Sequence, residues 1–340
     1  MLGPTCIFLL FLGLASGSDS WVAGFGGSAT KDRDGNVTEV SLRSAWVPDS
    51  ELARLSSFPK LRRLDLSLTH ISDRALEVLK DLPALIDLDL TYAEHITDAG
   101  LARLRDAKNL ERLVLEGAKI TDSGVNSLTS LANLRSLNLR CTQITDGALE
   151  HLESLTRLEH LAIGGNRIAG FGLIHLQALP GLKHLDLSGA QLTDDGIWSV
   201  ALSDLNIQTV ATLKGLESLN LAASELAGMA TIPDGGIREV ATLRITDLGV
   251  EMLKQIESLR SLDLTRSRIT ARGLRSLSEL PRLDRLSLAH IDRLDDSALG
   301  AIAQMKQLRM LDLSGVKVAN RETQNLMRQN GALRVVGMTQ

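Results

Sequence analysis

Histidine and aspartate side chains recur at one spacing in the middle of the chain. His160 and His184 lie 24 residues apart, and Asp186 follows His184 by two positions. Imidazole nitrogens and carboxylate oxygens are ligands that zinc accepts. A repeating unit also repeats its surface composition, so an ordinary solvated face produces the same spacing. We give the second explanation more weight and predict neither a metal site nor any other cofactor.

A second polar group lies nearer the N-terminus. Asp65, Asp87 and Asp89 are acidic side chains of the kind that bind a cation or a basic partner. Arginines are expected close to them and would neutralise much of their charge: Arg62, Arg63 and Arg112. The group therefore predicts a sign-mixed binding surface.

The sequence lacks the motifs of common catalytic sites. Gly-x-Ser-x-Gly, His-Glu-x-x-His, a phosphate-binding glycine loop ending in Lys-Ser/Thr, and Cys-x-x-Cys are all absent. Cys141 is expected to be a half-buried, inert thiol. We therefore predict that the protein is not an enzyme.

Composition indicates one small packing unit that is repeated. Leucine accounts for 66 of the 340 residues, against 5 Phe, 3 Trp and 1 Tyr. Basic residues number 37 and acidic residues 41, for a net charge of −4, which gives no support for binding to nucleic acid. No apolar run reaches the roughly 20 residues that a membrane span needs.

The motif Leu-x-x-Leu-x-Leu recurs about every 24 residues. In the second unit Leu64 and Leu66 alternate as in a strand, and Ile71, Leu76 and Leu79 follow at helical spacing. Each unit is therefore a short strand followed by a short helix, and it needs neighbours to bury its leucines. The units begin at Val37, Leu61, Leu85, Leu110, Leu134, Leu158, Leu182, Leu216, Leu259, Leu283, Leu308 and Leu333.

A three-residue motif, Ile-Thr-Asp or a close variant, separates strand from helix. Its Thr or Ser predicts an N-cap, and its Asp lies at the positive end of the helix dipole. A small residue follows in the helix, where it permits close approach of the backbones. The motif begins at Ile71, Ile96, Ile120, Ile144, Leu192 and Ile245, and the small residues are Gly100, Gly124, Ala148, Gly172, Gly196 and Gly273.

These units resemble those of leucine-rich repeat proteins. The pattern Leu-x-x-Leu-x-Leu…Ile-Thr-Asp-x-Gly-Leu-x-x-Leu is similar to the cysteine-containing subtype of F-box ubiquitin-ligase adaptors and to exported bacterial repeat proteins, and it covers residues 37 to 340. The resemblance implies an α/β solenoid of 12–13 repeats, shaped as a curved horseshoe. A parallel sheet would line its concave face, and short helices its convex face.

The two ends of the chain are expected to differ from the repeats. Residues 1–17 contain an apolar run, Cys6 to Ala15, that predicts a signal peptide and a secreted or periplasmic protein; the alternative is a cytoplasmic one. Residues 18–36 are assigned as a Gly/Ser-rich linker and turn. Trp46 is a candidate lid over the first repeat, and Leu333-x-x-Val336-x-Met338 is expected to be the final strand.

The regular spacing fails between Leu182 and Leu259. Irregular insertions are predicted around residues 201–210 and 225–244. The segment from Ile237 to Thr242 also reads as the strand of a degenerate repeat, which would give thirteen strands instead of twelve. Interrupting loops in a solenoid often carry binding contacts. The alternative is a drifted insertion without a partner.

Outward strand positions form columns on the concave face, and we predict that this face binds a protein. The chain would then be a non-catalytic binding module. We expect it to be a monomer, with neither nucleic acid nor a membrane as partner. The alternative is the substrate-recognition adaptor of a ubiquitin ligase, although no F-box is visible. The candidate residues are Asp65, Asp87, Asp89, Tyr92, Arg112, Asn138, His160, His184, Asp186, Asn220 and Asp263.

Overall fold

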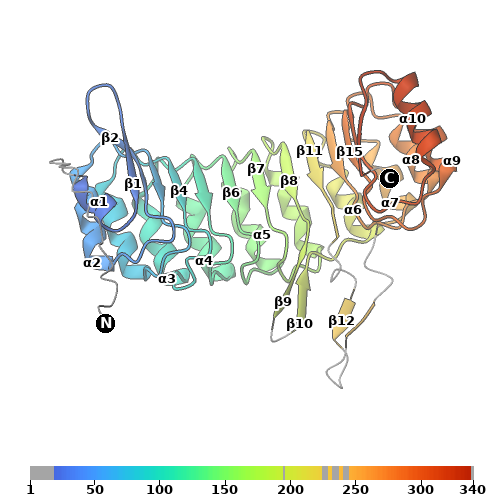
Figure 1. Ribbon diagram of the computed structural model, residues 1–340. Coiled ribbons are helices and arrows are strands. Elements are labelled where there is room, and N and C mark those ends of the chain that lie inside the picture. Colours follow the sequence, from blue (N-terminus) through green and yellow to red (C-terminus); the bar gives the residue numbers. More distant parts are fainter. Residues whose placement is uncertain (1–18, 194–195, 224–228, 232–236, 240–244, 338–340) are drawn as a thin grey trace, which may run out of the picture.

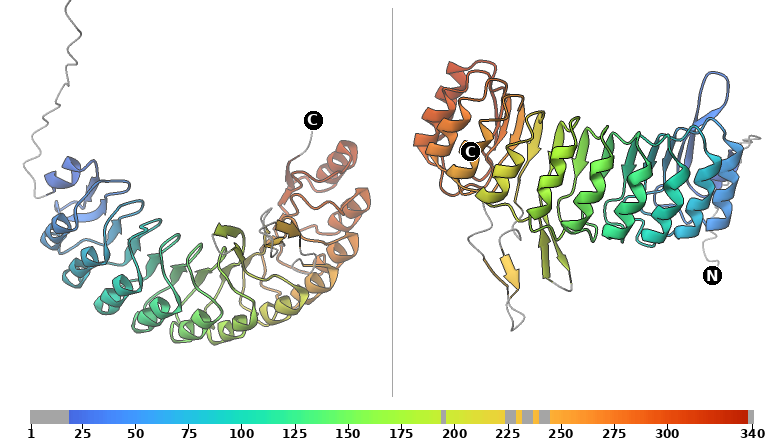
Figure 2. Two further views of the ribbon diagram at one scale, coloured as in Figure 1. Left: turned by 90° about the horizontal axis from the view of Figure 1, so that it is seen from below. Right: turned by 180° about the vertical axis from the view of Figure 1, so that it is seen from behind.

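The computed structural model shows a curved solenoid that spans the whole described chain (Figure 1). The structure describes residues 19–193, 196–223, 229–231, 237–239 and 245–337. The predicted signal peptide, residues 1–17, lies outside this part. Seen along the strands, the chain forms an open arc with the helices on the outside (Figure 2).

One sheet lines the inside of the arc. Within the described residues it contains thirteen strands, of which twelve are parallel and the first, β1, pairs antiparallel with β2. Each parallel strand comes from one leucine-rich unit. In sheet order the thirteen strands are β1 (Ser28–Lys31), β2 (Val37–Ser41), β3 (Arg63–Asp65), β4 (Asp87–Asp89), β5 (Arg112–Val114), β6 (Ser136–Asn138), β7 (His160–Ala162), β8 (His184–Asp186), β11 (Ser218–Asn220), β14 (Ser261–Asp263), β15 (Arg285–Ser287), β16 (Met310–Asp312) and β17 (Arg334–Val336).

Short helices line the outside of the arc, several of them of the 3-10 type. This confirms the predicted horseshoe with a concave sheet and convex helices. The α-helices are α1 (Ser20–Gly24), α2 (Asp49–Leu52), α3 (Asp98–Leu101), α4 (Asp122–Asn126), α5 (Gly147–His151), α6 (Asp204–Val210), α7 (Asp247–Leu253), α8 (Ala271–Leu277), α9 (Asp296–Ile302) and α10 (Asn320–Gln329). The 3-10 helices are η1 (Ala53–Ser57), η2 (Asp73–Asp81), η3 (Ala102–Asp106), η4 (Ser127–Ser130), η5 (Leu152–Ser154) and η6 (Phe171–Ala178).

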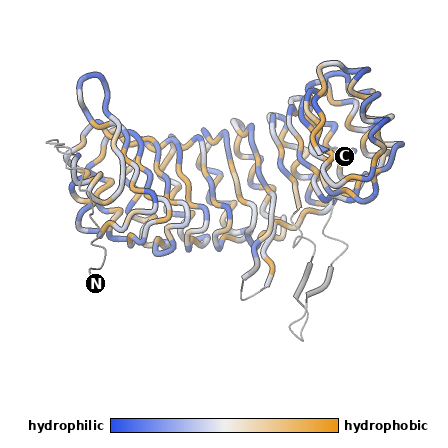
Figure 3. Tube along the Cα trace, in the orientation of Figure 1, coloured by the Kyte–Doolittle hydropathy of each residue, from blue (hydrophilic) through white to orange (hydrophobic). Residues whose placement is uncertain are grey.

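A single hydrophobic core runs between the sheet and the helices. The central leucines of successive strands, such as Leu64, Leu88 and Leu113, are buried and lie directly opposite one another in the sheet. Figure 3 shows apolar and polar residues alternating along each coil, as expected for strands with one face buried. Each coil thus packs on its neighbours, because three-residue strands and short helices cannot enclose a core alone.

The Ile-Thr-Asp motif caps the helices as predicted and also links one repeat to the next. The hydroxyl of Thr97 accepts a hydrogen bond from the amide of Ala99 in α3. The carboxylate of Asp73, one repeat earlier, accepts from both the amide and the hydroxyl of Thr97, at 2.8 and 2.7 Å. The same pair recurs as Asp49–Ser72, Asp98–Thr121, Asp122–Thr145, Asp204–Thr246 and Asp247–Thr270. We call this series the Asp–Thr ladder.

The N-terminal end is closed by a helix and a strand where the sequence predicted a linker. In α1 the indole of Trp21 is 5% exposed, and it packs edge-on against Phe25 at 6.4 Å. The strand β1 then covers the edge of β2. The Gly and Ser content of this segment led to the prediction of a linker, but two of its apolar side chains, Trp21 and Val22, are buried in the core. Trp46, the candidate lid, is 79% exposed and covers no core.

The first insertion lies before residue 201. Residues Ala190–Thr193 and Gly196–Ser199 form an antiparallel hairpin, β9 and β10, and residues 204–210 form the ordinary helix α6 of this repeat. The segment Leu192-Thr193 therefore lies in a strand, although it reads as the helix-capping motif. Ser203 and Asp204 begin the helix instead, and Asp204 occupies the usual place in the Asp–Thr ladder.

The second irregular region holds another antiparallel hairpin. Within residues 225–244 the structure describes β12 (Met229–Thr231) and β13 (Ile237–Glu239), which pair with each other. In the main sheet β11 pairs directly with β14. The interpretation of Ile237 as the start of a degenerate repeat is therefore wrong. The thirteenth strand of the main sheet is β1.

The last strand is shifted by one residue from the predicted motif. Val335 pairs with the buried Leu311, whereas Val336, which the motif places inside, is 52% exposed. Since side chains alternate along a strand, a shift of one residue exchanges the two faces. Leu333 remains buried at the start of the strand. Met338 lies outside the described residues.

Candidate functional site

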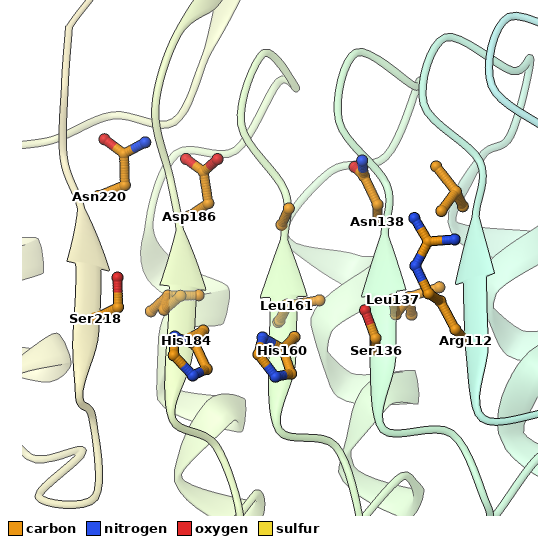
Figure 4. A pocket seen from close by; sticks show the side chains of 13 residues that line it. Arg112, Ser136, Leu137, Asn138, His160, Leu161, His184, Asp186, Ser218 and Asn220 are labelled. Atoms are coloured by element: carbon orange, nitrogen blue, oxygen red, sulfur yellow. The ribbon is translucent and has the colours of Figure 1, made fainter. Parts of the chain in front are cut away.

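The centre of the concave face holds a shallow pocket of about 360 Å³. Five parallel strands, β5 to β8 and β11, carry its side chains (Figure 4). The strands are in register, so residues at equal positions of the repeat form rows across the sheet. One row runs through Ser136, His160, His184 and Ser218, and a second contains Asn138, Asp186 and Asn220.

The second row carries one small side chain within the pocket. Ala162 on β7 stands between Asn138 on β6 and Asp186 on β8. All three residues line the pocket, and Figure 4 labels the two larger ones. The central leucines of the strands, Leu137 and Leu161, lie beneath and are buried. The pocket therefore has an apolar base and a polar wall, which is the usual construction of a ligand site.

His160 and His184 form a parallel stack. Their ring centroids lie 4.1 Å apart, and the ring planes differ by 3°. Burial lowers the pKa of the His160 imidazole, and a charge on His184 would lower the pKa further, whereas Glu159 opposes the shift. Two imidazolium rings at this separation would repel each other, so the stack favours at least one neutral ring.

The Asp and Asn side chains at the last position of the strands have a structural role that was not predicted. Each side chain accepts a hydrogen bond from the amide two residues later, at 2.8–3.1 Å, and so caps the turn after its strand. The recurrence of Asp or Asn at this position of the repeat was the available signal. This role applies to Asp65, Asp89, Asn138, Asp186, Asn220 and Asp263.

Arg140 belongs to the site although it was not a candidate. Its guanidinium donates to Asp186 Oδ2 at 2.7 Å and to Ser188 Oγ at 2.8 Å, which lie two repeats further along the chain. Gly164 lies beside this contact, and an added Cβ there would lie 1.9 Å from the Ser188 carbonyl oxygen and 3.0 Å from Arg140 Nη1. Arg140 neutralises Asp186 and leaves the pocket without a free carboxylate.

Asp65, Asp87 and Asp89 surround a second hollow of about 260 Å³ at the N-terminal end of the concave face. Two of the three expected arginines pair with Asp87: Arg112 at 2.8 Å, and Arg63 at 3.9 Å. The charge compensation predicted from the sequence is therefore present at Asp87, whereas Asp65 and Asp89 accept hydrogen bonds from Ser or Thr groups. Asp263 lies apart from both hollows, on β14.

Tyr92 lies in the turn after β4 and not on the strand face. Its backbone has φ 51°, a left-handed conformation, and the side chain is 44% exposed. The ring covers Gly117 of the next repeat, where an added Cβ would lie 2.3 Å from the ring. Cys141 is in the corresponding turn, over Gly165, and burial raises the pKa of its thiol. Both residues therefore pack between turns.

The arrangement offers no metal centre in the part of the chain that the structure describes, where no group of three or more His, Cys, Asp or Glu side chains could hold an ion. The imidazoles face each other, and Asp186 is paired with Arg140. None of the described helices has the length and hydropathy that crossing a bilayer requires. The serine hydroxyls and imidazoles that line the pocket can form hydrogen bonds with a ligand.

Comparisons with known proteins agree with the repeat architecture. A leucine-rich repeat family model matches residues 108–168 and 132–192, and a second one matches residues 59–80 and 255–278. The chain therefore has the fold of a leucine-rich repeat solenoid, and these segments match leucine-rich repeat models. No curated protein matched the chain in the sequence search.

Two solved bacterial structures are similar in fold. An internalin (inlF) from Listeria monocytogenes superposes with a TM-score of 0.56 and 18% identity, over 96% of this chain and 95% of that one. A leucine-rich repeat protein from Leptospira interrogans gives a TM-score of 0.52 and 18% identity, over 83% and 74% of the two chains. At this identity the likeness concerns the fold alone.

Proposed function

We propose that the chain is a non-catalytic module that binds a protein through its concave face. The observation that carries this proposal is the central pocket, whose lining comes from five strands held in register above a continuous core and includes serine, asparagine and histidine side chains. A preformed surface of this kind loses little conformational entropy on binding, so its polar contacts contribute to affinity. No observation favours the ubiquitin-ligase adaptor, and we do not propose it.

A selection of random displayed peptides on the immobilised chain tests this function. Ala162→Trp would fill the pocket between Asn138 and Asp186, because Ala162 on β7 lines it between these two residues. Ala99→Trp makes the same change at an exposed position of α3 on the convex face and is the matched control. We expect the enriched peptides to bind the wild type and Ala99→Trp but not Ala162→Trp.

Ser136→Trp is a second variant in the same pocket, on the neighbouring strand β6. This variant keeps the test valid if Ala162→Trp fails to fold. Circular dichroism of every variant shows whether it has folded. If enriched peptides bind both pocket variants as tightly as the wild type, the concave centre is not the binding site. If no peptide is enriched on the wild type, the proposal that this face binds polypeptides fails.

We also propose that the protein is exported. The apolar run from Cys6 to Ala15, followed by small residues, is typical of a cleaved signal peptide. Mass spectrometry of the protein expressed with its own N-terminus is expected to find a mature chain beginning near Ser18. An intact Met1 in the cell interior would contradict export.

A further inference from the structure

Five neighbouring strands present a row of unused hydrogen-bond donors. The side chains of this donor row are Ser136, His160, His184, Ser218 and Ser261, which are paired across β6, β7, β8, β11 and β14. None of the five forms a side-chain hydrogen bond within the described residues. No carboxylate interrupts the row. Strands are about 4.8 Å apart, so the donor row is about 19 Å long.

The charged groups around the two histidines are already compensated within the protein. Glu159, which precedes β7, forms ion pairs with two basic residues. Arg135, which precedes β6, lies 2.5 Å away, and Lys183, which precedes β8, lies 3.1 Å away. Asp186 on β8 pairs with Arg140. Glu217, which precedes β11, lies 3.7 Å from Arg260.

Cations also flank the donor row at both ends. Arg112 on β5 precedes Ser136, and Arg285 on β15 follows Ser261. Each has an aspartate beside it, Asp87 for Arg112 and Asp284 for Arg285. The donor row therefore consists of neutral hydrogen-bond donors, and the carboxylates around it form ion pairs with basic side chains. Protonation of the histidine stack would give the donor row a positive charge.

We infer that the donor row binds an acidic, extended peptide segment of the protein partner, and that the His160–His184 stack takes up a proton as the segment binds. This inference rests on the proposed function of the concave face. A peptide carboxylate beside the stack would accept hydrogen bonds from the imidazole N–H groups and the serine hydroxyls. It would also offset the repulsion that opposes protonation of the stacked rings, so binding and proton uptake favour each other.

Isothermal titration with hexaglutamate tests the inference, because an extended chain of about six residues matches the length of the donor row. Hexaglutamine and hexalysine are the uncharged and opposite-charge probes. We expect hexaglutamate to bind about tenfold more tightly near pH 5.5 than near pH 7.5, since one linked proton changes affinity by up to tenfold per pH unit. Titrations in two buffers with different heats of ionisation should show net proton uptake.

A double variant, His160→Gln with His184→Gln, keeps hydrogen-bond donors in the donor row but removes the titration. It should lose both the pH dependence and the proton uptake. His175→Gln is the matched control, because His175 lies on the convex helix η6 and pairs with Glu153. It should behave as the wild type.

Three outcomes would overturn the inference: hexaglutamine binding as tightly as hexaglutamate, binding that does not change with pH, or an unchanged pH profile in the double histidine variant. These outcomes are separate from those that test the proposed function. If displayed peptides without acidic residues bind the wild type and are excluded by Ala162→Trp, the concave face is a peptide-binding surface and only the acidic-segment inference is wrong.

Discussion

Single aspartate carboxylates connect each of several repeats to the next through the Asp–Thr ladder. The Asp–Thr ladder places a carboxylate oxygen against the first turn of the following helix, where a glycine usually stands. An added Cβ would approach this oxygen to 2.3 Å at Gly100 and Gly124, and to 2.5 Å at Gly249 and Gly273. The small residue of the repeat is thus explained by a side chain of the preceding repeat, as well as by close backbone approach.

Gly124→Ala is therefore expected to destabilise the protein by about 1 to 2 kcal/mol, because the methyl group would displace Asp98 Oδ1 from the Thr121 amide. Alanine is present at the same position in two other repeats, as Ala75 and Ala148, where the pairs Asp49–Ser72 and Asp122–Thr145 are intact. The expected cost therefore comes from the closer approach of the Asp98 carboxylate to the helix at Gly124. Denaturant unfolding followed by circular dichroism measures the change.

Gly300→Ala is the control for this substitution. Gly300 lies in α9, and an added Cβ would meet no atom within 4 Å. Alanine is a better helix former than glycine, so Gly300→Ala should stabilise the protein by roughly 0.5 to 1 kcal/mol. Equal effects of the two substitutions would show that the Asp–Thr ladder does not restrict the size of this residue.

At the scale of helices and strands, the regular units could be predicted and the interruptions could not. The leucine period located each parallel strand before β17, because every unit buries the same face. The first insertion was misplaced because Leu192-Thr193-Asp194 has the composition of a helix cap. Only Asp204, by reaching Thr246, shows where the helix begins. Sequence spacing identified His160 and His184 of the donor row for the same reason. It did not identify the three serines of the row, or Arg140, whose contacts cross two repeats.

Deleting residues 191–200 tests whether the first hairpin is an addition to an intact repeat. The deletion would join Ala190 to Ala201, whose amide already bonds to the Ile168 carbonyl as in the regular repeats. We expect native circular dichroism and a loss of unfolding free energy of about 1 to 3 kcal/mol. Surface insertions have small entropic effects, but the deleted Val200 is buried. Loss of folding would show that the hairpin completes the core of this repeat.

At the scale of the whole molecule, a solenoid depends on how its ends are closed. Trp21 of α1 closes the N-terminal end, packed against Phe25 and with the guanidinium of Arg54 at 5.2 Å from its ring. Since each repeat contacts only its neighbours, a defect at this end should weaken the first strands more than the distant ones.

Trp21→Ala is expected to cost about 3 to 5 kcal/mol, as for other large buried side chains. Hydrogen exchange should increase at β2 and β3 and stay unchanged at β15 and β16. Trp46→Ala is the control, because Trp46 is largely exposed and contacts His70, 4.6 Å away between ring centroids. It should change stability by less than about 0.5 kcal/mol. Uniform exchange along the array after Trp21→Ala would contradict nearest-neighbour behaviour.

The Asp–Thr ladder has a consequence for engineering the length of the protein. The contacts of Asp98 with Thr121 are repeated by Asp122 with Thr145, so both seams of the 110–133 segment have the same chemistry. A second copy of this segment inserted after residue 133 would meet compatible partners on each side. The arc could then be lengthened one coil at a time, which would give a series of solenoids with identical ends and increasing distances between those ends.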